Sequence, residues 1–220
     1  MTAHDEPHVD DHAHEHAHAP HPPARPDTDD TLTYYKAMEI AVRELLIEKG
    51  VISAEDVRRA IEAMDARSPA QGARVVARAW SDPAYKARLL ADPNSAIKEL
   101  GIEPGVYKLV VLENTPSVHN LVVCTLCSCY PRGVLGLPPD WYKSRAYRSR
   151  AVREPRVVLR EFGTKIPDHI EVRVHDSTAD MRYLVLPERP AGTEGLSESA
   201  LAELVTRDSM IGVARVLAPG

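Results

Sequence analysis

Cysteine is scarce in this sequence, with three residues in 220, and no long apolar run is present. So few cysteines exclude the disulfide framework of a small secreted domain. No stretch approaches the roughly 20 apolar residues that cross a membrane, and no apolar segment follows a basic start at the amino end. Positive charge is not in excess, because the sequence has 27 Lys and Arg residues and 32 Asp and Glu residues, which gives a formal net charge of -5. We therefore expect a cytoplasmic protein that binds neither membranes nor nucleic acid.

The composition is otherwise that of a globular protein, since 44% of the residues are hydrophobic and the length is close to that of one domain. Residues 31–104 show helical spacing of apolar side chains, with helix-start signals at Ser53, Asp82 and Asp92. They predict a helical arm, which can cover a partner as easily as its own chain.

Residues 105–220 change to the pattern of strands. Runs rich in Val and Leu predict two strands around a turn at 107–112 and 120–123, and a further strand pair at 172–175 and 181–186. A helix is expected near residues 144–161, between the two pairs. The fold class is therefore α+β, with a tail at 1–30, a helical arm at 31–104 and a layered α/β metal-binding domain at 105–220.

Seven of the ten histidines lie in the first 21 residues, alternating with acidic residues and alanine and followed by prolines. This pattern predicts a disordered tail, because it has no apolar periodicity with which to build a core. Imidazoles at this density bind divalent transition metals, so one hypothesis is that the tail gathers cobalt. The alternative is a solvated tail without a function. The histidines are His4, His8, His12, His14, His16, His18 and His21.

The three cysteines lie within six positions, at Cys124, Cys127 and Cys129, which indicates a metal site. Structural zinc and iron-sulfur clusters generally need four ligands of the Cys or His type, and a second Cys pair is missing from this sequence. A redox Cys-x-x-Cys motif would leave Cys129 unexplained. A cluster of free thiols or a facultative disulfide is the alternative without a metal.

A metal chelate that includes backbone nitrogens explains the spacing of the three cysteines better than these alternatives. The thiolates of Cys127 and Cys129 and the backbone nitrogens of Ser128 and Cys129 can lie in one plane around a metal, and Cys124 can cap that plane. A sixth position then stays open, as a catalytic metal requires. Deprotonated amides favour a strongly polarising ion, which points to iron or cobalt.

Residues 124–129, Cys-Thr-Leu-Cys-Ser-Cys, resemble the metal-claw motif of the nitrile hydratase alpha subunit and of the related thiocyanate hydrolase gamma subunit. The resemblance extends over about residues 34–215. The other segments that resemble the family are 134–143, 147–150, 152–156, 189–193 and 204–212.

The resemblance implies the fold of the nitrile hydratase alpha subunit and a hydro-lyase activity that needs a partner. Cys124 would be the unmodified axial thiolate, Cys127 a sulfinate and Cys129 a sulfenate, with amide nitrogens of Ser128 and Cys129 completing the ligands. Cys129 and Ser128 are the implied catalytic residues. Thr125 resembles the cobalt type, so Co(III) is the expected cofactor and Fe(III) the alternative.

The implied partner is a beta-type subunit in a hetero-oligomer, and a metallochaperone is a further candidate partner. The run of arginines from Arg145 to Arg160 would pack against the partner subunit. Glu113, His119 and Asn120 either orient the metal ligands or bond to a turn at the strand ends, and we favour the second interpretation.

Arg132 and Gly133 depart from the family pattern, because nitrile hydratases mostly have Trp-Pro at these positions. An arginine here resembles the thiocyanate hydrolase gamma subunit, where a cation beside the metal could hold the thiocyanate anion. We therefore expect Arg132 in the substrate pocket, with an outward-facing position in a subunit interface as the alternative. Nitrile hydration, within nitrile metabolism, is the first hypothesis for the function. Conversion of thiocyanate to carbonyl sulfide and ammonia is the second, and a non-enzymatic metal-binding protein is the third.

Overall fold

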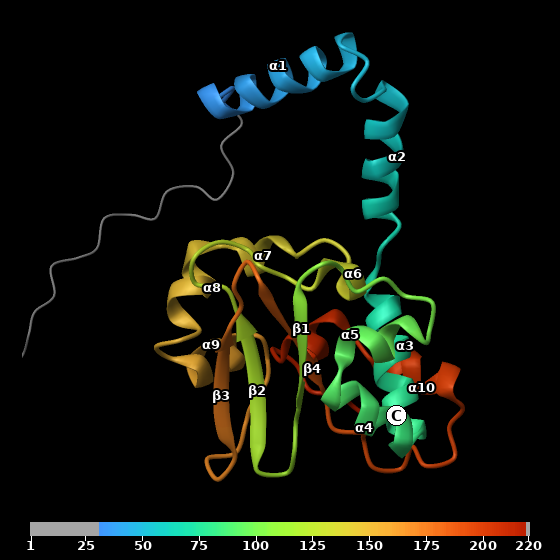
Figure 1. The fold of residues 1–220 in the computed structure, drawn as a ribbon. Coiled ribbons are helices and arrows are strands. Elements are labelled where there is room, and N and C mark those ends of the chain that lie inside the picture. The colour runs from blue at the N-terminus through green and yellow to red at the C-terminus, as the bar shows by residue number, and fades with distance from the viewer. Residues whose placement is uncertain (1–30, 219–220) are drawn as a thin grey trace, which may run out of the picture.

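The computed structural model describes residues 31–218, so the tail expected at residues 1–30 lies outside the described residues. Two helices extend from a body in which helices surround four strands (Figure 1). None of the helices within residues 31–218 is both long and apolar enough to cross a membrane. The helices are α1 (Tyr34–Glu48), α2 (Ala54–Asp65), α3 (Pro69–Ser81), α4 (Pro83–Ala91), α5 (Pro93–Lys98), α6 (Arg132–Leu135), α7 (Asp140–Lys143), α8 (Arg145–Arg150), α9 (Pro155–Glu161), α10 (Glu198–Leu204) and α11 (Arg207–Ile211), and the strands are β1 (Lys108–Glu113), β2 (Val118–Val123), β3 (Glu171–Asp176) and β4 (Met181–Leu186).

The helices α1 and α2 form an arm that stands away from the body (Figure 1). The Thr33 hydroxyl accepts a hydrogen bond from the Lys36 amide at the start of α1. Ser53 and Asp56 form a reciprocal capping box at the start of α2. No residue of either helix is buried. The apolar side chains of the arm therefore have no core of their own chain to pack into.

The helices α3, α4 and α5 pack into the core. Val75, Leu89 and Ile97 are fully buried and belong to the same apolar cluster as the inward side chains of β1 and β2. Asp82 and Asp92 cap α4 and α5 with their side chains, as expected. The arm expected over residues 31–104 thus divides in the structure, because only α1 and α2 extend from the body.

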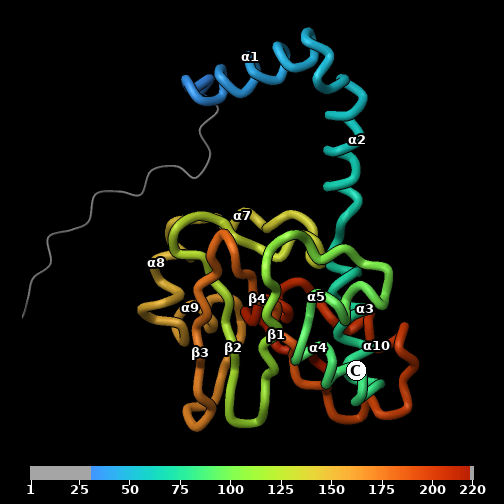
Figure 2. The backbone as a smooth tube through the Cα atoms, in the orientation of Figure 1, coloured from blue at the N-terminus to red at the C-terminus, as the bar shows by residue number. Residues whose placement is uncertain are grey.

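The four strands occur where they are expected, but their pairing differs. β2 pairs in parallel with β3, and β1 pairs in parallel with β4, so the strands that follow each other in sequence are not ladder partners. The expectation that 172–175 and 181–186 pair with each other was wrong. Parallel pairing suits β2, which is buried from its second residue onward. Figure 2 shows the strands gathered at the centre of the body.

Short helices join β2 to β3 and supply the crossover that a parallel pair requires. The helix expected near 144–161 is split into α8 and α9, because Pro155 starts a new helix at its first turn. A short helix, α6, begins at Arg132, three residues after Cys129. Helix α9 lies beside β3, and α4 and α5 lie beside β1 (Figure 1).

Candidate metal centre

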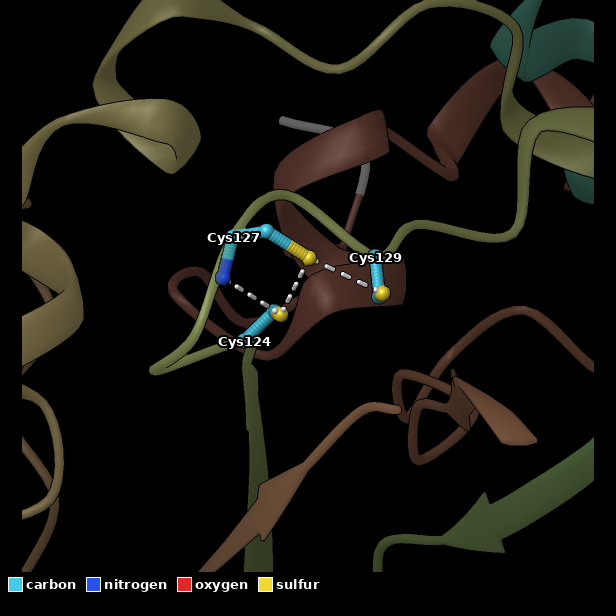
Figure 3. Close-up of side chains that lie close together, drawn as sticks. All are labelled: Cys124, Cys127 and Cys129. Atoms are coloured by element: carbon cyan, nitrogen blue, oxygen red, sulfur yellow. Dashed lines mark hydrogen bonds between the residues drawn. The ribbon is translucent and has the colours of Figure 1, made fainter. Parts of the chain in front are cut away.

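The three cysteine side chains meet directly after the buried strand β2 ends at Val123. The Sγ atoms of Cys124 and Cys127 lie 3.5 Å apart, and those of Cys127 and Cys129 lie 3.2 Å apart (Figure 3). The Cys127 amide also donates to Cys124 Sγ at 3.3 Å. Cys124 and Cys129 are buried and Cys127 is exposed. The loop therefore presents one sulfur to solvent and holds two in the protein.

Side chains from the helices that follow the loop, two of them buried tyrosines, hold its backbone. The Tyr147 hydroxyl donates to the Val122 carbonyl at 2.6 Å, just before the loop. The Tyr142 hydroxyl donates to the Cys129 carbonyl at 2.8 Å. Arg148 donates to the Leu126 carbonyl at 3.0 Å. These three residues fix the loop at both ends and in its middle, and sequence analysis did not identify their role.

Asp176, at the end of β3, holds the second residue of the motif. Its carboxylate accepts hydrogen bonds from both the amide and the hydroxyl of Thr125, at 2.9 and 2.5 Å. The parallel ladder places Val123 opposite Asp176, so the strand that delivers Cys124 ends beside the strand that delivers this carboxylate. Only the strand pairing could have revealed this contact, because 51 positions separate the two residues.

The three thiols fit a transition-metal ion. All three sulfur atoms lie within 4.8 Å of one another. Burial and the hydrogen bond with Cys127 raise the pKa of the Cys129 thiol to about 12, whereas the hydrogen bond from Cys129 lowers the pKa of the Cys127 thiol. Three thiolates at this spacing repel one another, and a bound cation offsets that repulsion. Thiolate donors favour transition metals such as cobalt or iron over hard cations.

Two hollows adjoin the thiols. One, of about 140 Å³, is lined by all three cysteines and by residues 176–179, which end β3 and begin the turn after it. The other, of about 320 Å³, has Arg132 in its lining together with Cys127, Ser128 and Cys129 but does not reach Cys124. The structure thus brings Arg132 to the same hollow as the expected catalytic residues. Arg182, which sequence analysis missed, lines this hollow as well.

Glu113, His119 and Asn120 lie away from both hollows, around the turn between β1 and β2. His119 is buried with Nε2 2.7 Å from the Gly212 carbonyl, and the Asn120 amide group donates to the Glu113 carbonyl at 2.9 Å. Burial lowers the pKa of His119. These residues bond to the turn and to the end of α11, which is the alternative that the sequence analysis favours.

The arginines from Arg145 to Arg160 make different kinds of contact. Arg145 and Arg148 line a third hollow, of about 400 Å³, together with Thr125 and Leu126. Arg150 instead pairs with Glu154 and Glu161. Part of this basic surface therefore adjoins the cysteine loop directly.

The family model for the nitrile hydratase alpha chain matches residues 33–214. The chain belongs to this family. It is 54% identical over 176 residues to the alpha subunit of the low-molecular weight cobalt-containing nitrile hydratase of Rhodococcus rhodochrous, covering 79% of this chain and 84% of the relative. It is 47% identical over 192 residues to the thiocyanate hydrolase gamma subunit of Thiobacillus thioparus, covering 82% and 79%.

The fold agrees with that of solved family members. A double mutant of the Fe-type nitrile hydratase from Comamonas testosteroni Ni1 superposes with a TM-score of 0.78 at 45% identity, covering 87% of this chain and 94% of that chain. The expected α+β class and the resemblance to nitrile hydratase alpha subunits are therefore confirmed. Cobalt as the expected metal, with iron as the alternative, agrees with these relatives and with the cysteine cluster.

Replacing Asp176 with asparagine is expected to lower metal occupancy or activity of the assembled protein by about 10- to 100-fold, the usual effect of losing a group that orients metal ligands. The NH2 group that replaces one carboxylate oxygen cannot accept the Thr125 hydroxyl bond, and the bond to the remaining oxygen loses its charge. Cobalt per chain, measured by elemental analysis after timed loading, tests this. Asp168→Asn, in an exposed loop, is the matched control. Equal occupancy and activity in the two variants would contradict the role of Asp176.

Proposed function

We propose that this chain is the metal-bearing alpha-type subunit of a nitrile hydratase, which hydrates nitriles to amides. One observation carries the proposal: in a chain of the nitrile hydratase alpha family, three cysteine sulfurs converge within 4.8 Å. Two of these residues, Cys127 and Cys129, border a hollow of about 320 Å³, which is large enough for a small substrate.

Cys124, Cys127 and Cys129 would hold the metal, together with backbone nitrogens of Ser128 and Cys129. The bound ion, Co(III) with Fe(III) as the alternative, supplies Lewis-acid polarisation without a change of oxidation state. The other steps of the reaction would depend on side chains of this protein. Oxidised Cys127 and Cys129 would carry oxygen atoms at the edge of the hollow, and the Cys129 oxygen is the candidate nucleophile or base. Asp176, Tyr142 and Arg148 keep the loop in place while these groups act.

A beta-type partner subunit completes the site in this proposal. The arm of α1 and α2 contributes no buried residue to its own chain. Leu126 is 88% exposed beside the exposed Cys127. Apolar side chains on the arm and on the metal loop are thus exposed in the chain alone. A partner subunit would bury such side chains at a hetero-oligomer interface. We expect the chain alone to be inactive.

Co-expression with the neighbouring partner gene in cobalt-supplemented medium tests the function. The purified complex is assayed against acrylonitrile, benzonitrile and thiocyanate. Amide formation from the nitriles is the expected result. Carbonyl sulfide and ammonia from thiocyanate, without amide from the nitriles, would establish the second candidate function instead. Arg132 in the lining of the hollow is the observation that favours this second candidate.

Mass spectrometry of the peptide that contains the three cysteines separates both enzymes from a non-enzymatic metal-binding protein. An enzyme of this family would carry two added oxygens on Cys127 and one on Cys129, with tightly held metal. A metal carrier would have reduced thiols and exchangeable metal.

The histidines of the tail, which lie outside the described residues, support a separate proposal of cobalt gathering. Deletion of residues 1–30 is expected to lower cobalt occupancy several-fold at limiting cobalt and to leave it unchanged in excess cobalt, because imidazoles raise the local concentration of the metal. Elemental analysis of the purified complex measures this. A full-length chain with the seven tail histidines changed to glutamine separates their effect from that of tail length. Unchanged occupancy at limiting cobalt would contradict the idea.

A further inference from the structure

The two parallel strand pairs of the body point in opposite directions, and the metal loop lies at the carboxyl end of only one pair. The tight turn from β1 to β2 reverses the chain, so β1 and β4 end where β2 and β3 begin (Figure 1). Cys124 follows β2 and Asp176 ends β3, whereas Asn114 and Pro187 follow β1 and β4. Ligands of parallel sheets commonly bind in the crevice outside the carboxyl ends of the strands. The body thus has a second edge of the kind at which ligands bind.

A hollow of about 280 Å³ lies at this second edge. Its lining includes Asn114, Pro187 and His119, and it shares no residue with the two hollows that adjoin the cysteines. His119 is buried, with its Nε2 atom 2.7 Å from the Gly212 carbonyl oxygen and its Nδ1 atom 3.4 Å from Nδ2 of Asn114. The floor of the hollow therefore consists of groups that are already hydrogen-bonded to the protein.

Two arginines fix the side walls of this hollow. Arg156 of α9 donates to the carbonyl oxygens of Ile166 and Ile170, whose side chains form one wall. Arg189 donates to the hydroxyl and the carbonyl of Thr193 and so holds the loop of the other wall. Within residues 31–218 neither guanidinium pairs with a carboxylate, so both keep their positive charge beside the hollow. The walls are also ordered before any ligand binds, which lowers the cost of binding.

The charged groups around the hollow leave an excess of positive charge. Its lining holds Arg189 and Arg215 but a single carboxylate, that of Glu188. The Nη2 atom of Arg215 lies 3.6 Å from Oε2 of Glu188, which is beyond hydrogen-bond distance, and the Arg215 side chain is 48% exposed. Its donors are therefore open to a ligand. Burial lowers the pKa of His119, and the positive charges of Arg215 and Arg156 lower it further, so the positive potential extends to the floor.

We propose that this hollow is a second ligand site, which binds a small organic carboxylate with an apolar body. Val118, Ile166 and Ile170 supply an apolar surface for the body, and Arg215 binds the carboxylate through charge-assisted hydrogen bonds. A neutral ligand would leave the excess positive charge without a partner, and an inorganic anion would leave the apolar surface in contact with water. The inference goes beyond the proposed function and does not depend on it, because the hollow shares no residue with the metal loop.

Isothermal titration of 4-bromobenzoate into the assembled, cobalt-loaded complex tests the site, with the neutral 4-bromobenzamide as the paired probe. Wild type is expected to bind the carboxylate at least about tenfold more tightly than the amide, which corresponds to one charge-assisted interaction. Arg215→Gln should remove most of that ratio. Arg160→Gln, at an exposed position on α9, is the matched control and should preserve it. Ala191→Phe, at an exposed position of the lining, should block the carboxylate by filling the hollow, and an unchanged Tm would show that its fold is intact.

The bromine atom also locates the ligand. Anomalous diffraction from crystals of the complex soaked with 4-bromobenzoate should place the bromine beside Val118 and Ile170. A carboxylate can also coordinate a metal, so bromine only at the cysteine loop, or an affinity unchanged by both Arg215→Gln and Ala191→Phe, would overturn the proposal. Equal affinity for the acid and the amide would overturn it as well, because Arg215 would then not select charge. Bromine in the hollow of the crystal without heat in solution would mean binding at crystal concentration only, which also contradicts the proposal. None of these measurements uses turnover, so the result stands whether or not the complex hydrates nitriles.

Discussion

Replacing Cys129 with serine is expected to abolish turnover by the assembled complex, with kcat lower by about 10³-fold or more. The serine hydroxyl cannot supply a soft thiolate to the metal, nor can it be oxidised to the sulfur species that would carry the reactive oxygen. The variant should also lose cobalt, because it removes one of the three sulfur ligands and keeps only the amide nitrogen of residue 129. Cobalt per chain and the rate of amide formation from acrylonitrile measure the two effects.

Ser128→Ala is the informative comparison for the metal. It removes a half-buried hydroxyl but keeps the amide nitrogen that would bind the metal. We therefore expect Ser128→Ala to keep its cobalt while Cys129→Ser loses it. A Cys129→Ser complex that binds cobalt and hydrates nitriles at the normal rate would refute the role assigned to this sulfur. Circular dichroism of each variant checks that its fold is intact.

Gly212→Ala is expected to lower the free energy of unfolding by about 3–5 kcal/mol, which is the second large effect. Gly212 ends α11 in the left-handed region, at a φ of 91°. A Cβ there would lie 2.0 Å from the carbonyl oxygen of Asn120 and 3.1 Å from the Cα of Leu121, both in β2. Because β2 carries the metal loop, the strand cannot move aside without displacing Cys124. The apparent Tm of the complex should fall by roughly 10 °C, or soluble protein should be lost.

Gly163→Ala separates the clash from the backbone strain. Gly163 has a φ of 80°, but an added Cβ would meet nothing within 4 Å. We expect the free energy of unfolding to fall by only about 1 kcal/mol, and hence the Tm to fall by a few degrees. Thermal unfolding of both variants in parallel measures the difference. Equal losses in the two variants would show that the packing of α11 against β2 contributes little.

The sequence predicts most of the local structure, for reasons that lie within a few residues of each element. Ser53, Asp82 and Asp92 cap helices where their spacing indicates. The strands at β1, β2, β3 and β4 agree with the runs of Val and Leu. Strand pairing was not predictable in the same way, because a turn between two strands is compatible with pairing to more distant partners. The contribution of α3–α5 to the core likewise depends on which surface they meet.

The candidate site also has a part that the local sequence predicts and a part that depends on the tertiary structure. Three cysteines within six positions determine a thiol cluster by themselves, because the chain between them is too short to separate the sulfurs widely. The resemblance of the motif also indicated its family before any contact was known.

Only the tertiary structure decided what surrounds the cluster. Asp176 reaches Thr125 because β2 and β3 run in parallel and end together, and Arg182 reaches the hollow because β4 pairs with β1. These contacts join residues 50 or more positions apart, so no local pattern encodes them. The sequence thus determined the thiol cluster, and the packing of the strands determined which charged groups lie next to it.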